Sequence, residues 1–426
     1  MTSLGKPSLR RNVIYSALAN AIFSFTQWGI VAVVVHWGHS EQVGAITVVT
    51  ALITPIFMFA QMAMRDGLSV DDLDHFSQAD YIALRAVSSF IAVLASALLI
   101  LFYLAPSGEM VQLAGLAYVF VKLMGSQTNM NHGIFQRAEK LDFVALSMLS
   151  RGVFGFAFFA CAFYYSRDLG VAFFAEALAW SAGFFLIDRP LLARMGARTK
   201  FHEVIGADPR KVLQLAKWML PLGVAILLMN AAASVPRLAL ERSASLSVVG
   251  VFGAIAYLNV ALNIFSSSIG TASASRMRRQ FRSGKKGKFI KLTAELLAAC
   301  GVLGLSLIFA ASYWGKEALE LIYGSNYARS DVLTITVAAA ALRILAAPLQ
   351  FAMNAGQAFG KRMQNSVVTF AAAVAAALLL IPSFGVIGAA WALFVQSAVN
   401  LVSTLLSFGR LVLSMGPAVP EVKENP

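Results

Sequence analysis

Residues 364–382 read QNSVVTFAAAVAAALLLIP, and this stretch decides the class of fold. It carries no charged residue and matches the roughly 20 residues that a helix needs to cross the hydrocarbon core of a bilayer. Its alanine run, Ala371 to Ala377, favours helix. The chain shows no long alternation of polar and apolar residues of the kind that indicates a membrane β-barrel. The stretch therefore predicts a transmembrane helix.

The rest of the chain has the same character. Of its 426 residues, 58% are hydrophobic and 13% are charged, about half the charged share of a typical soluble domain. Such a chain cannot cover itself with polar surface, so its solvent is largely lipid. A soluble enzyme and a disulfide scaffold are excluded, and the two cysteines, Cys161 and Cys300, lie in apolar runs.

Twelve stretches are long and apolar enough to span a membrane. They are residues 14–36, 43–65, 81–104, 111–134, 143–165, 169–187, 213–235, 246–270, 290–312, 331–354, 364–382 and 385–408. We therefore predict an all-α polytopic membrane protein with twelve transmembrane helices. The loops between them are short, and none is long enough to fold as a separate catalytic domain.

Lysine and arginine are distributed unevenly between the two sides of these spans. With the N-terminus inside, the inner segments carry 26 of the 34 basic residues and the outer loops, which include Arg237, carry five. Three more lie within spans, and Arg65 and Arg85 are expected at the level of the lipid headgroups. Because cytoplasmic loops are rich in Lys and Arg, both termini are expected in the cytoplasm. The bias accounts for the net charge of +13 without nucleic acid.

The chain also indicates an internal repeat. Sliding it on itself by 221 residues places Lys122 over Arg343 and Asn129 over Gln350. Six spans lie on each side of a central loop, which predicts two pseudo-symmetric six-helix bundles in the same orientation. The expected domains are an N-terminal bundle (1–187), a cytoplasmic linker (188–212) and a C-terminal bundle with a short cytoplasmic tail (213–426).

Polar side chains recur at helical spacing in both predicted bundles, so each set lies on one face of its helix. Such stripes often act only as hydrogen-bonded contacts between membrane helices. Their repetition on equivalent pairs of spans favours a shared water-filled cleft, a central cavity between the bundles. The amides expected to bind a polar substrate there are Asn20, Gln27, Gln61, Asn129, Asn259, Asn263 and Gln350.

Lys122 and Arg343 are the sharpest candidates for a binding site, because each lies near the middle of its span. A cation at that depth costs roughly 2.5–3.5 kcal/mol, which is tolerable only beside water, a carboxylate or an anionic ligand. The competing interpretation is a structural ion pair with Glu176 or Glu295, the two carboxylates within spans. Either carboxylate is also a candidate for ion coupling. Arg151, nearer the inner face, is a weaker candidate for substrate binding.

No other chemistry is indicated. The sequence contains no nucleophile and base constellation, no zinc spacing and no glycine-rich dinucleotide turn, so we expect no cofactor and no metal. The basic tract from Arg276 to Lys288 does not match a phosphate-binding loop. It is interpreted as a loop that sets the topology and faces lipid headgroups.

Five short motifs occur in a fixed order along the chain. They are Trp218-Met-Leu-Pro-Leu-Gly, Val249-Gly-Val-Phe-Gly-Ala-Ile-Ala-Tyr, Leu321-Ile-Tyr-Gly-Ser-Asn-Tyr-Ala, Ala355-Gly-Gln-Ala-Phe-Gly-Lys and Ile381-Pro-Ser-Phe-Gly-Val-Ile-Gly-Ala-Ala. Through them the chain resembles the multidrug/oligosaccharidyl-lipid/polysaccharide exporter superfamily, in particular its bacterial polysaccharide flippase branch. The first half departs most, since Glu41-Gln-Val-Gly-Ala-Ile-Thr is a degraded version of the family's usual loop.

This resemblance implies two six-helix bundles around a central cavity, working by alternating access in the bacterial cytoplasmic membrane. It implies a transporter rather than an enzyme, which moves undecaprenyl-pyrophosphate-linked oligosaccharide to the outer leaflet for polysaccharide biosynthesis. Lys122 and Arg343 would then bind the pyrophosphate. The expected partners are the lipid-linked oligosaccharide, membrane lipids and a polysaccharide polymerase with other biosynthesis proteins. Two alternatives are a cation-coupled multidrug exporter and a membrane-embedded polysaccharide polymerase or ligase.

Overall fold

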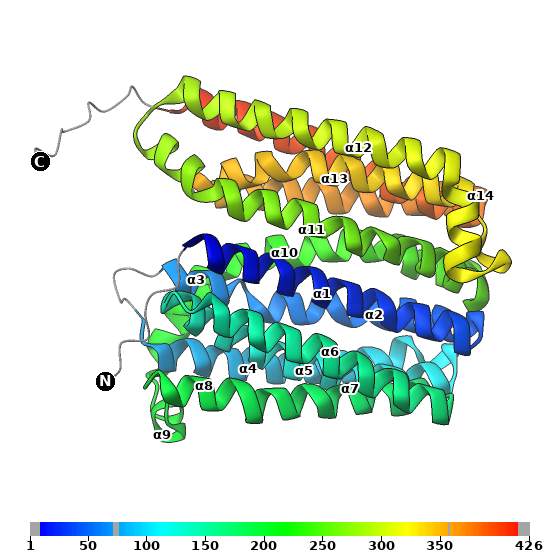
Figure 1. Ribbon diagram of the computed structural model, residues 1–426, viewed down its shortest axis with the longest axis horizontal. Coiled ribbons are helices and arrows are strands. Elements are labelled where there is room, and N and C mark those ends of the chain that lie inside the picture. Colours follow the sequence, from blue (N-terminus) through cyan, green and yellow to red (C-terminus); the bar gives the residue numbers. More distant parts are fainter. Residues whose placement is uncertain (1–8, 71–75, 357, 416–426) are drawn as a thin grey trace, which may run out of the picture. The chain divides into compact units, whose positions relative to one another are not determined.

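The computed structural model describes residues 9–70, 76–356 and 358–415, which contain helices and no strand (Figure 1). The helices are α1 (Leu9–Trp37), α2 (Ser40–Gln61), α3 (Met64–Val70), α4 (Gln78–Tyr103), α5 (Glu109–Arg137), α6 (Leu141–Ser166), α7 (Leu169–Gly183), α8 (Arg189–Arg194), α9 (Phe201–Ile205), α10 (Pro209–Ser243), α11 (Leu246–Arg282), α12 (Lys286–Tyr323), α13 (Ser330–Ala355) and α14 (Phe359–Leu413). A π-helical turn, Phe184–Asp188, joins α7 to α8.

Each of the twelve predicted spans falls on these helices, which confirms the predicted fold class. The last two both lie in α14, which is two helices joined at Gly385, where φ is 53° and ψ is −124°. Glycine reaches this backbone conformation without a Cβ clash, and Pro382 just before it cannot continue the hydrogen bonding of the first helix. The stretch 364–382 thus lies in a helix that ends at Gly385, three residues after its proline.

Nine of the described helical segments are long and apolar enough to cross a membrane. The helix α5 is not among them, although its 29 residues are sufficient in length. Its C-terminal half is polar, and it packs against α2, α3, α4, α6 and α7. A helix surrounded by other helices needs no lipid-facing apolar surface, so α5 can carry polar residues that an outer helix cannot.

The chain forms two compact units. The first comprises Met1–Asn230 and Ser245–Ala254, and the second comprises Ala231–Ala244 and Ile255–Pro426. The beginning of α10, predicted as the start of the second half, packs with the first unit, because Leu215 and Met219 share a buried core with Met64 and Tyr81. Within the second unit, α13 packs against both α12 and α14.

Within the first unit, α2 and the beginning of α11 cross with almost no space between them. A Cβ added at Gly44 of α2 would lie 2.7 Å from the carbonyl carbon of Leu246 in α11, and one at Gly250 would meet the Ser40 carbonyl. Ser40 and Ser247 are hydrogen-bonded through their hydroxyls at 2.6 Å. One close helix crossing therefore explains the glycines in two motifs of the sequence, residues 41–47 and 249–257.

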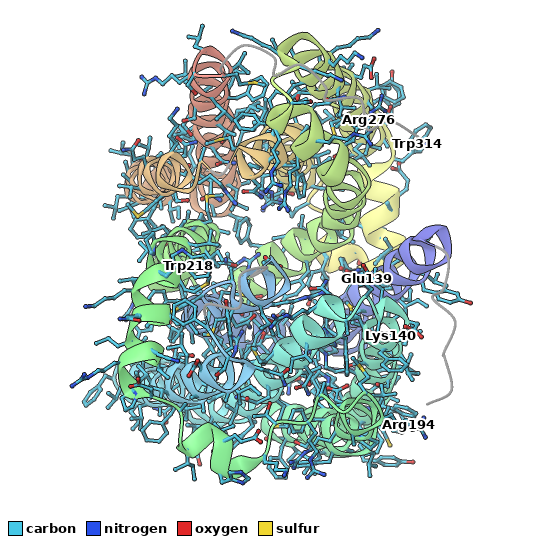
Figure 2. All side chains as sticks on the ribbon, turned by 90° about the vertical axis from the view of Figure 1, so that its left-hand side faces the viewer. Glu139, Lys140, Arg194, Trp218, Arg276 and Trp314 are labelled. Carbon is cyan, nitrogen blue, oxygen red and sulfur yellow. The ribbon has the colours of Figure 1, made fainter. Side chains whose placement is uncertain are left out.

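One end of the first unit is rich in charged side chains. Figure 2 shows Glu139, Lys140 and Arg194 at the end that faces the viewer, together with the exposed Trp218. Glu139 and Lys140 form the turn between α5 and α6, and Arg194 ends α8. Charged residues at helix ends and an exposed tryptophan are typical of a membrane–water interface.

Candidate functional site

Glu176 is the centre of a buried polar group inside the first unit. It lies in α7 and is 1% exposed. The Gln27 amide of α1 donates a 3.5 Å hydrogen bond to Oε1, and Oε2 has no hydrogen-bond partner among the described residues. Lys122 of α5 and Arg151 of α6 both interact electrostatically with this carboxylate. Four predicted residues from four helices are therefore brought together.

Arg151 is held inside the bundle by two aromatic rings. Its guanidinium lies 4.7 Å from the ring centroid of Phe23 and 4.6 Å from that of Trp180. Gly125 and Gly155 leave the space that the Trp180 indole fills, since a Cβ at either would lie within 3 Å of it. A guanidinium over aromatic faces is stabilised without a carboxylate, most strongly where water is excluded. This packing therefore helps to explain, without any substrate, why an arginine is tolerated at position 151.

Lys122 is half-buried on α5, one helical turn beyond Tyr118. Its ammonium nitrogen lies 5.0 Å from the centroid of the Tyr118 ring. The Tyr118 hydroxyl is 3.5 Å from the Thr54 hydroxyl of α2. With Glu176 also acting on it, Lys122 has the surroundings of a structural ion pair as well as those of a binding residue.

A buried carboxylate that sequence reasoning missed lies next to this group. Asp188 was predicted to begin the cytoplasmic linker, but it is 1% exposed and interacts electrostatically with Arg151. The π-helical turn before α8 places it there, because Pro190 has no N–H to continue the α-helical hydrogen bonds. An aspartate directly before an Arg-Pro pair is typical of a loop, so the sequence contained no clear indication that Asp188 is buried.

Two further polar residues of α5 line the same region. His132 is 1% exposed, and its Nε2 is 2.8 Å from the Ser147 hydroxyl of α6. Arg65 donates a 3.0 Å hydrogen bond from Nε to the Gln136 side chain. The polar half of α5 is thus bonded to α3 and α6, and such bonds between helices are the stabilising contacts expected of buried polar residues in membranes.

Arg343 of α13 is the corresponding cation of the second unit. It is half-buried, and its buried Nε has no hydrogen-bond partner among the residues that the structure describes. Arg237 acts on it by Coulomb repulsion. Arg237 was predicted in an outer loop, but α10 continues through Pro236 to Ser243, and the Arg237 guanidinium lies 5.8 Å from the Tyr257 ring centroid. Two cations therefore interact here, where sequence reasoning expected one.

The remaining predicted residues are less closely associated. Asn20, Gln61, Asn129 and Gln350 are half-buried on α1, α2, α5 and α13. Asn259 and Asn263 lie in the part of α11, residues 259–272, whose side chains are outside the described residues. Glu295 is exposed on α12, seven residues after Lys288. Of the two predicted coupling carboxylates, only Glu176 is buried among other charged groups.

Arg85, which was predicted at the level of the lipid headgroups, is buried inside the first unit. It is 0% exposed between α4 and α5, and donates one hydrogen bond of 3.2 Å from a terminal nitrogen to the Ser126 hydroxyl. Its Nε and its other terminal nitrogen have no hydrogen-bond partner among the described residues. The position, only seven residues into α4, indicated an interfacial residue, but the tertiary packing of α5 covers it.

Replacing Arg85 with methionine is expected to stabilise the protein by about 1–3 kcal/mol, because an incompletely bonded buried cation is exchanged for an apolar side chain of similar length. The measurement is thermal unfolding of the purified protein in detergent. Arg85→Ala is the control, since it removes the same charge but leaves a cavity, and it should not be stabilising. A lower melting temperature for Arg85→Met would show that the cation has a stabilising partner in the membrane.

Comparison with solved structures shows which known fold this protein has. The chain is similar to the Vibrio cholerae MATE transporter VcmN, with a TM-score of 0.67 and 14% identity over 96% of this chain and 98% of that one. It is also similar to the eukaryotic MATE transporter AtDTX14, with a TM-score of 0.66 and 13% identity over 95% and 98% of the two chains. The protein is a multi-pass membrane protein with the fold of MATE transporters, which is the fold that the predicted resemblance implied.

A comparison of sequences gives a relative in polysaccharide synthesis. The chain is 23% identical over 402 residues to the capsular polysaccharide biosynthesis protein CapF of Staphylococcus aureus. The match covers 94% of this chain and 99% of CapF. No family model matches the chain.

Proposed function

We propose that this protein is a flippase that translocates undecaprenyl-pyrophosphate-linked oligosaccharide across the bacterial cytoplasmic membrane for polysaccharide biosynthesis. The observation that carries the proposal is the similarity to a capsular polysaccharide biosynthesis protein along almost the whole chain, on a transporter fold. A polysaccharide assembled from lipid-linked units requires a step that moves those units between leaflets. A transporter fold in such a pathway is suited to that step.

Arg343 and Lys122 would bind the pyrophosphate. The guanidinium of Arg343 can donate two parallel hydrogen bonds to phosphate oxygens, and its interaction with Arg237 supports an anionic ligand, since a phosphate would offset the repulsion between the two. Lys122 supplies a second charge, shared with Glu176. The half-buried amides, among them Gln61, would bond to sugar hydroxyls. Transport would proceed by alternating access, with a cationic central cavity.

The orientation and setting follow from the charge distribution. Both termini would lie in the cytoplasm, because 26 of the 34 basic residues then fall on the inner side. A polysaccharide polymerase and other biosynthesis proteins would act on the product. If transport is coupled to an ion, Glu176 would be the coupling residue, because it is a buried carboxylate whose second oxygen has no hydrogen-bond partner among the described residues.

In a capsule-forming strain that lacks its own exporter, Arg343→Gln and Lys122→Gln are each expected to lower surface polysaccharide about tenfold or more, the effect of losing a hydrogen bond to a charged group. Lipid-linked intermediate should accumulate on the inner leaflet. Arg343→Lys should keep part of the activity, because it retains charge but loses the paired hydrogen bonds. The exposed Lys316 provides the control variant Lys316→Gln. Normal export in both test variants, at matched protein levels, would remove the proposed site.

A cation-coupled drug exporter is the second candidate, since one of the similar structures is a multidrug resistance MATE family transporter, with a TM-score of 0.66 and 13% identity over 95% of this chain and 96% of that one. The interacting cations Arg237 and Arg343 disfavour it, because they would repel organic cations. Efflux of a fluorescent organic cation from cells that express the protein decides between the two. We expect no efflux above that of the empty vector.

A further inference from the structure

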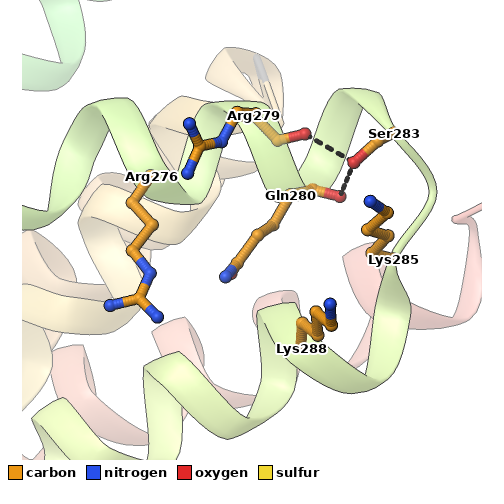
Figure 3. Close-up of a pocket in the computed structure, with 6 residues that line it drawn as sticks. All are labelled: Arg276, Arg279, Gln280, Ser283, Lys285 and Lys288. Atoms are coloured by element: carbon orange, nitrogen blue, oxygen red, sulfur yellow. Dashed lines mark hydrogen bonds between the residues drawn. The ribbon is translucent and has the colours of Figure 1, made fainter. Parts of the chain in front are cut away.

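The basic tract that was predicted to set the topology and to face lipid headgroups forms a pocket. Arg276, Arg279, Gln280 and Ser283 at the end of α11, with Lys285 and Lys288 at the start of α12, line a cavity of about 370 Å³ (Figure 3). Four of the six lining residues are cations and none is a carboxylate. The tract from Arg276 to Lys291 contains eight basic residues and no acidic one.

The pocket is shaped by the turn between the two helices. Gly284 takes a φ of 64°, which reverses the chain, and the Lys285 amide donates a 3.1 Å hydrogen bond to the Gln280 carbonyl. The Ser283 hydroxyl donates a 2.8 Å hydrogen bond to the Arg279 carbonyl. The backbone around the cavity is therefore fixed by its own hydrogen bonds.

An apolar core holds the two sides of the pocket together. Phe281, next to Gln280, and Phe289, next to Lys288, have ring centroids 5.6 Å apart. Phe289 and Met277 are 0% exposed in a core that also contains residues of α13 and α14. This packing fixes the backbone at Gln280 and Lys288, and Gln280 is itself buried, which lowers the entropic cost of binding at that side chain.

The polar groups of the pocket suit an oxyanion. Gln280 is 9% exposed, and in Figure 3 its amide nitrogen and the Arg276 guanidinium extend into the space between the helices, with Lys288 across from them. All of these groups donate hydrogen bonds. Cations that face one cavity repel one another, and an anion there removes that cost. Basic pockets between membrane helices on the cytoplasmic side are typical sites for anionic headgroups.

We propose that this pocket, which the proposed orientation places on the cytoplasmic side, is a binding site for a phosphate group. A phosphate has the charge and the several acceptor oxygens that match two guanidinium groups, two ammonium groups and an amide. The same chemistry is presented by the headgroup of an anionic phospholipid and by a free or cargo-borne pyrophosphate. If the tract only set the topology, positive charge on this side of the membrane would be sufficient. Replacing cations of the pocket and replacing neighbouring cations would then have the same effect on phosphate binding.

The chain offers a matched pair of variants. The pocket variant is Arg276→Gln/Arg279→Gln/Lys288→Gln. The control variant is Arg278→Gln/Arg282→Gln/Lys291→Gln, which removes three exposed cations from the same tract that do not line the pocket. Both keep five of the eight basic residues, so the topogenic charge is equal. Gln280→Glu is an independent third variant, which removes no cation but places a carboxylate in the cavity.

Binding is measured on the purified full-length protein in neutral detergent at low ionic strength, with two probes: sodium pyrophosphate by calorimetry and short-chain phosphatidylglycerol by native mass spectrometry. We expect the pocket variant and Gln280→Glu to weaken binding by about tenfold or more, and the control variant by less than about threefold. If the pocket substitutions weaken the binding of phosphatidylglycerol alone, the site binds a lipid headgroup. If they also weaken the binding of pyrophosphate, the site binds any accessible phosphate.

Three results would overturn the proposal. They are the absence of binding of either probe to the unaltered protein, equal losses in the pocket and control variants, and unchanged binding in Gln280→Glu when that variant elutes as the unaltered protein does. Because the assay involves no transport, its outcome is separate from that of the export test above.

Discussion

Gly250→Val is expected to prevent the protein from accumulating in a folded form. A Cβ at this position would meet the Ser40 carbonyl and lie 2.9 Å from the Gly44 amide nitrogen. These are backbone atoms of α2, so no rotamer change can relieve the contact, and the helices must separate. Overpacking of a core typically costs 1–3 kcal/mol, and we expect a cost of about 3 kcal/mol or more here because the obstacle is backbone.

The measurement is the yield of monodisperse protein on size-exclusion chromatography, together with its melting temperature. Gly44→Val should have the same effect, since the Leu246 backbone lies directly opposite. The matched control is Gly409→Val in α14, where an added Cβ has no atom within 4 Å. That variant should stay within about 1 kcal/mol of the unaltered protein. Folded, thermally stable Gly250→Val would show that α2 and α11 do not pack so closely in the membrane.

Glu176→Leu is expected to destabilise the first unit by about 3–5 kcal/mol, because it leaves two cations buried without their shared carboxylate. Lys122 and Arg151 both act on Glu176, and Gln27 would lose its acceptor. The quantity to measure is the free energy of unfolding in mixed detergent micelles, or the melting temperature where unfolding is irreversible.

The double variant Glu176→Leu/Lys122→Met tests whether charge is the cause. If the loss comes from an unpaired cation, removing one cation with its partner should recover about 1–3 kcal/mol of stability. Arg151 would keep its two aromatic neighbours and Asp188. Two additive losses in place of this recovery would contradict the coupling between Glu176 and Lys122. An unaffected single variant would indicate that Glu176 is already neutral in the folded protein.

The pairing of Glu176 bears on both interpretations of Lys122. Lys122 lies near a carboxylate, as the ion-pair interpretation required, whereas Arg343 interacts with a second cation. Lys122 and Arg343, which the predicted internal repeat would make equivalent, therefore differ in electrostatic environment. Of the two, Arg343 has the stronger case as an anion-binding residue.

Much of the site was predicted one helix at a time. Their positions within apolar stretches identified Gln27, Lys122, Arg151 and Glu176 as polar residues inside spans, and a polar residue in a span must find a partner. Which partners they find depends on how α1, α5, α6 and α7 pack, and a single sequence contains no direct measure of that. The burial of Asp188 and Arg85 was not predicted for the same reason, because other helices cover both residues.

The sequence by itself determined that this is a twelve-span helical membrane protein, including the turn in residues 364–408 that interrupts α14. Hydropathy predicts the helices because a backbone group without a hydrogen bond is too costly in lipid. A long apolar stretch without the alternation of a β-barrel can satisfy its backbone groups only as a helix. Only the tertiary structure decided which charges meet, that the glycines at 44 and 250 share one crossing, and that four cations of the basic tract line a pocket. The first two outcomes depend on residues that are distant in sequence, and the pocket lies beside a core that includes residues of α13 and α14, so local periodicity carries no information about them.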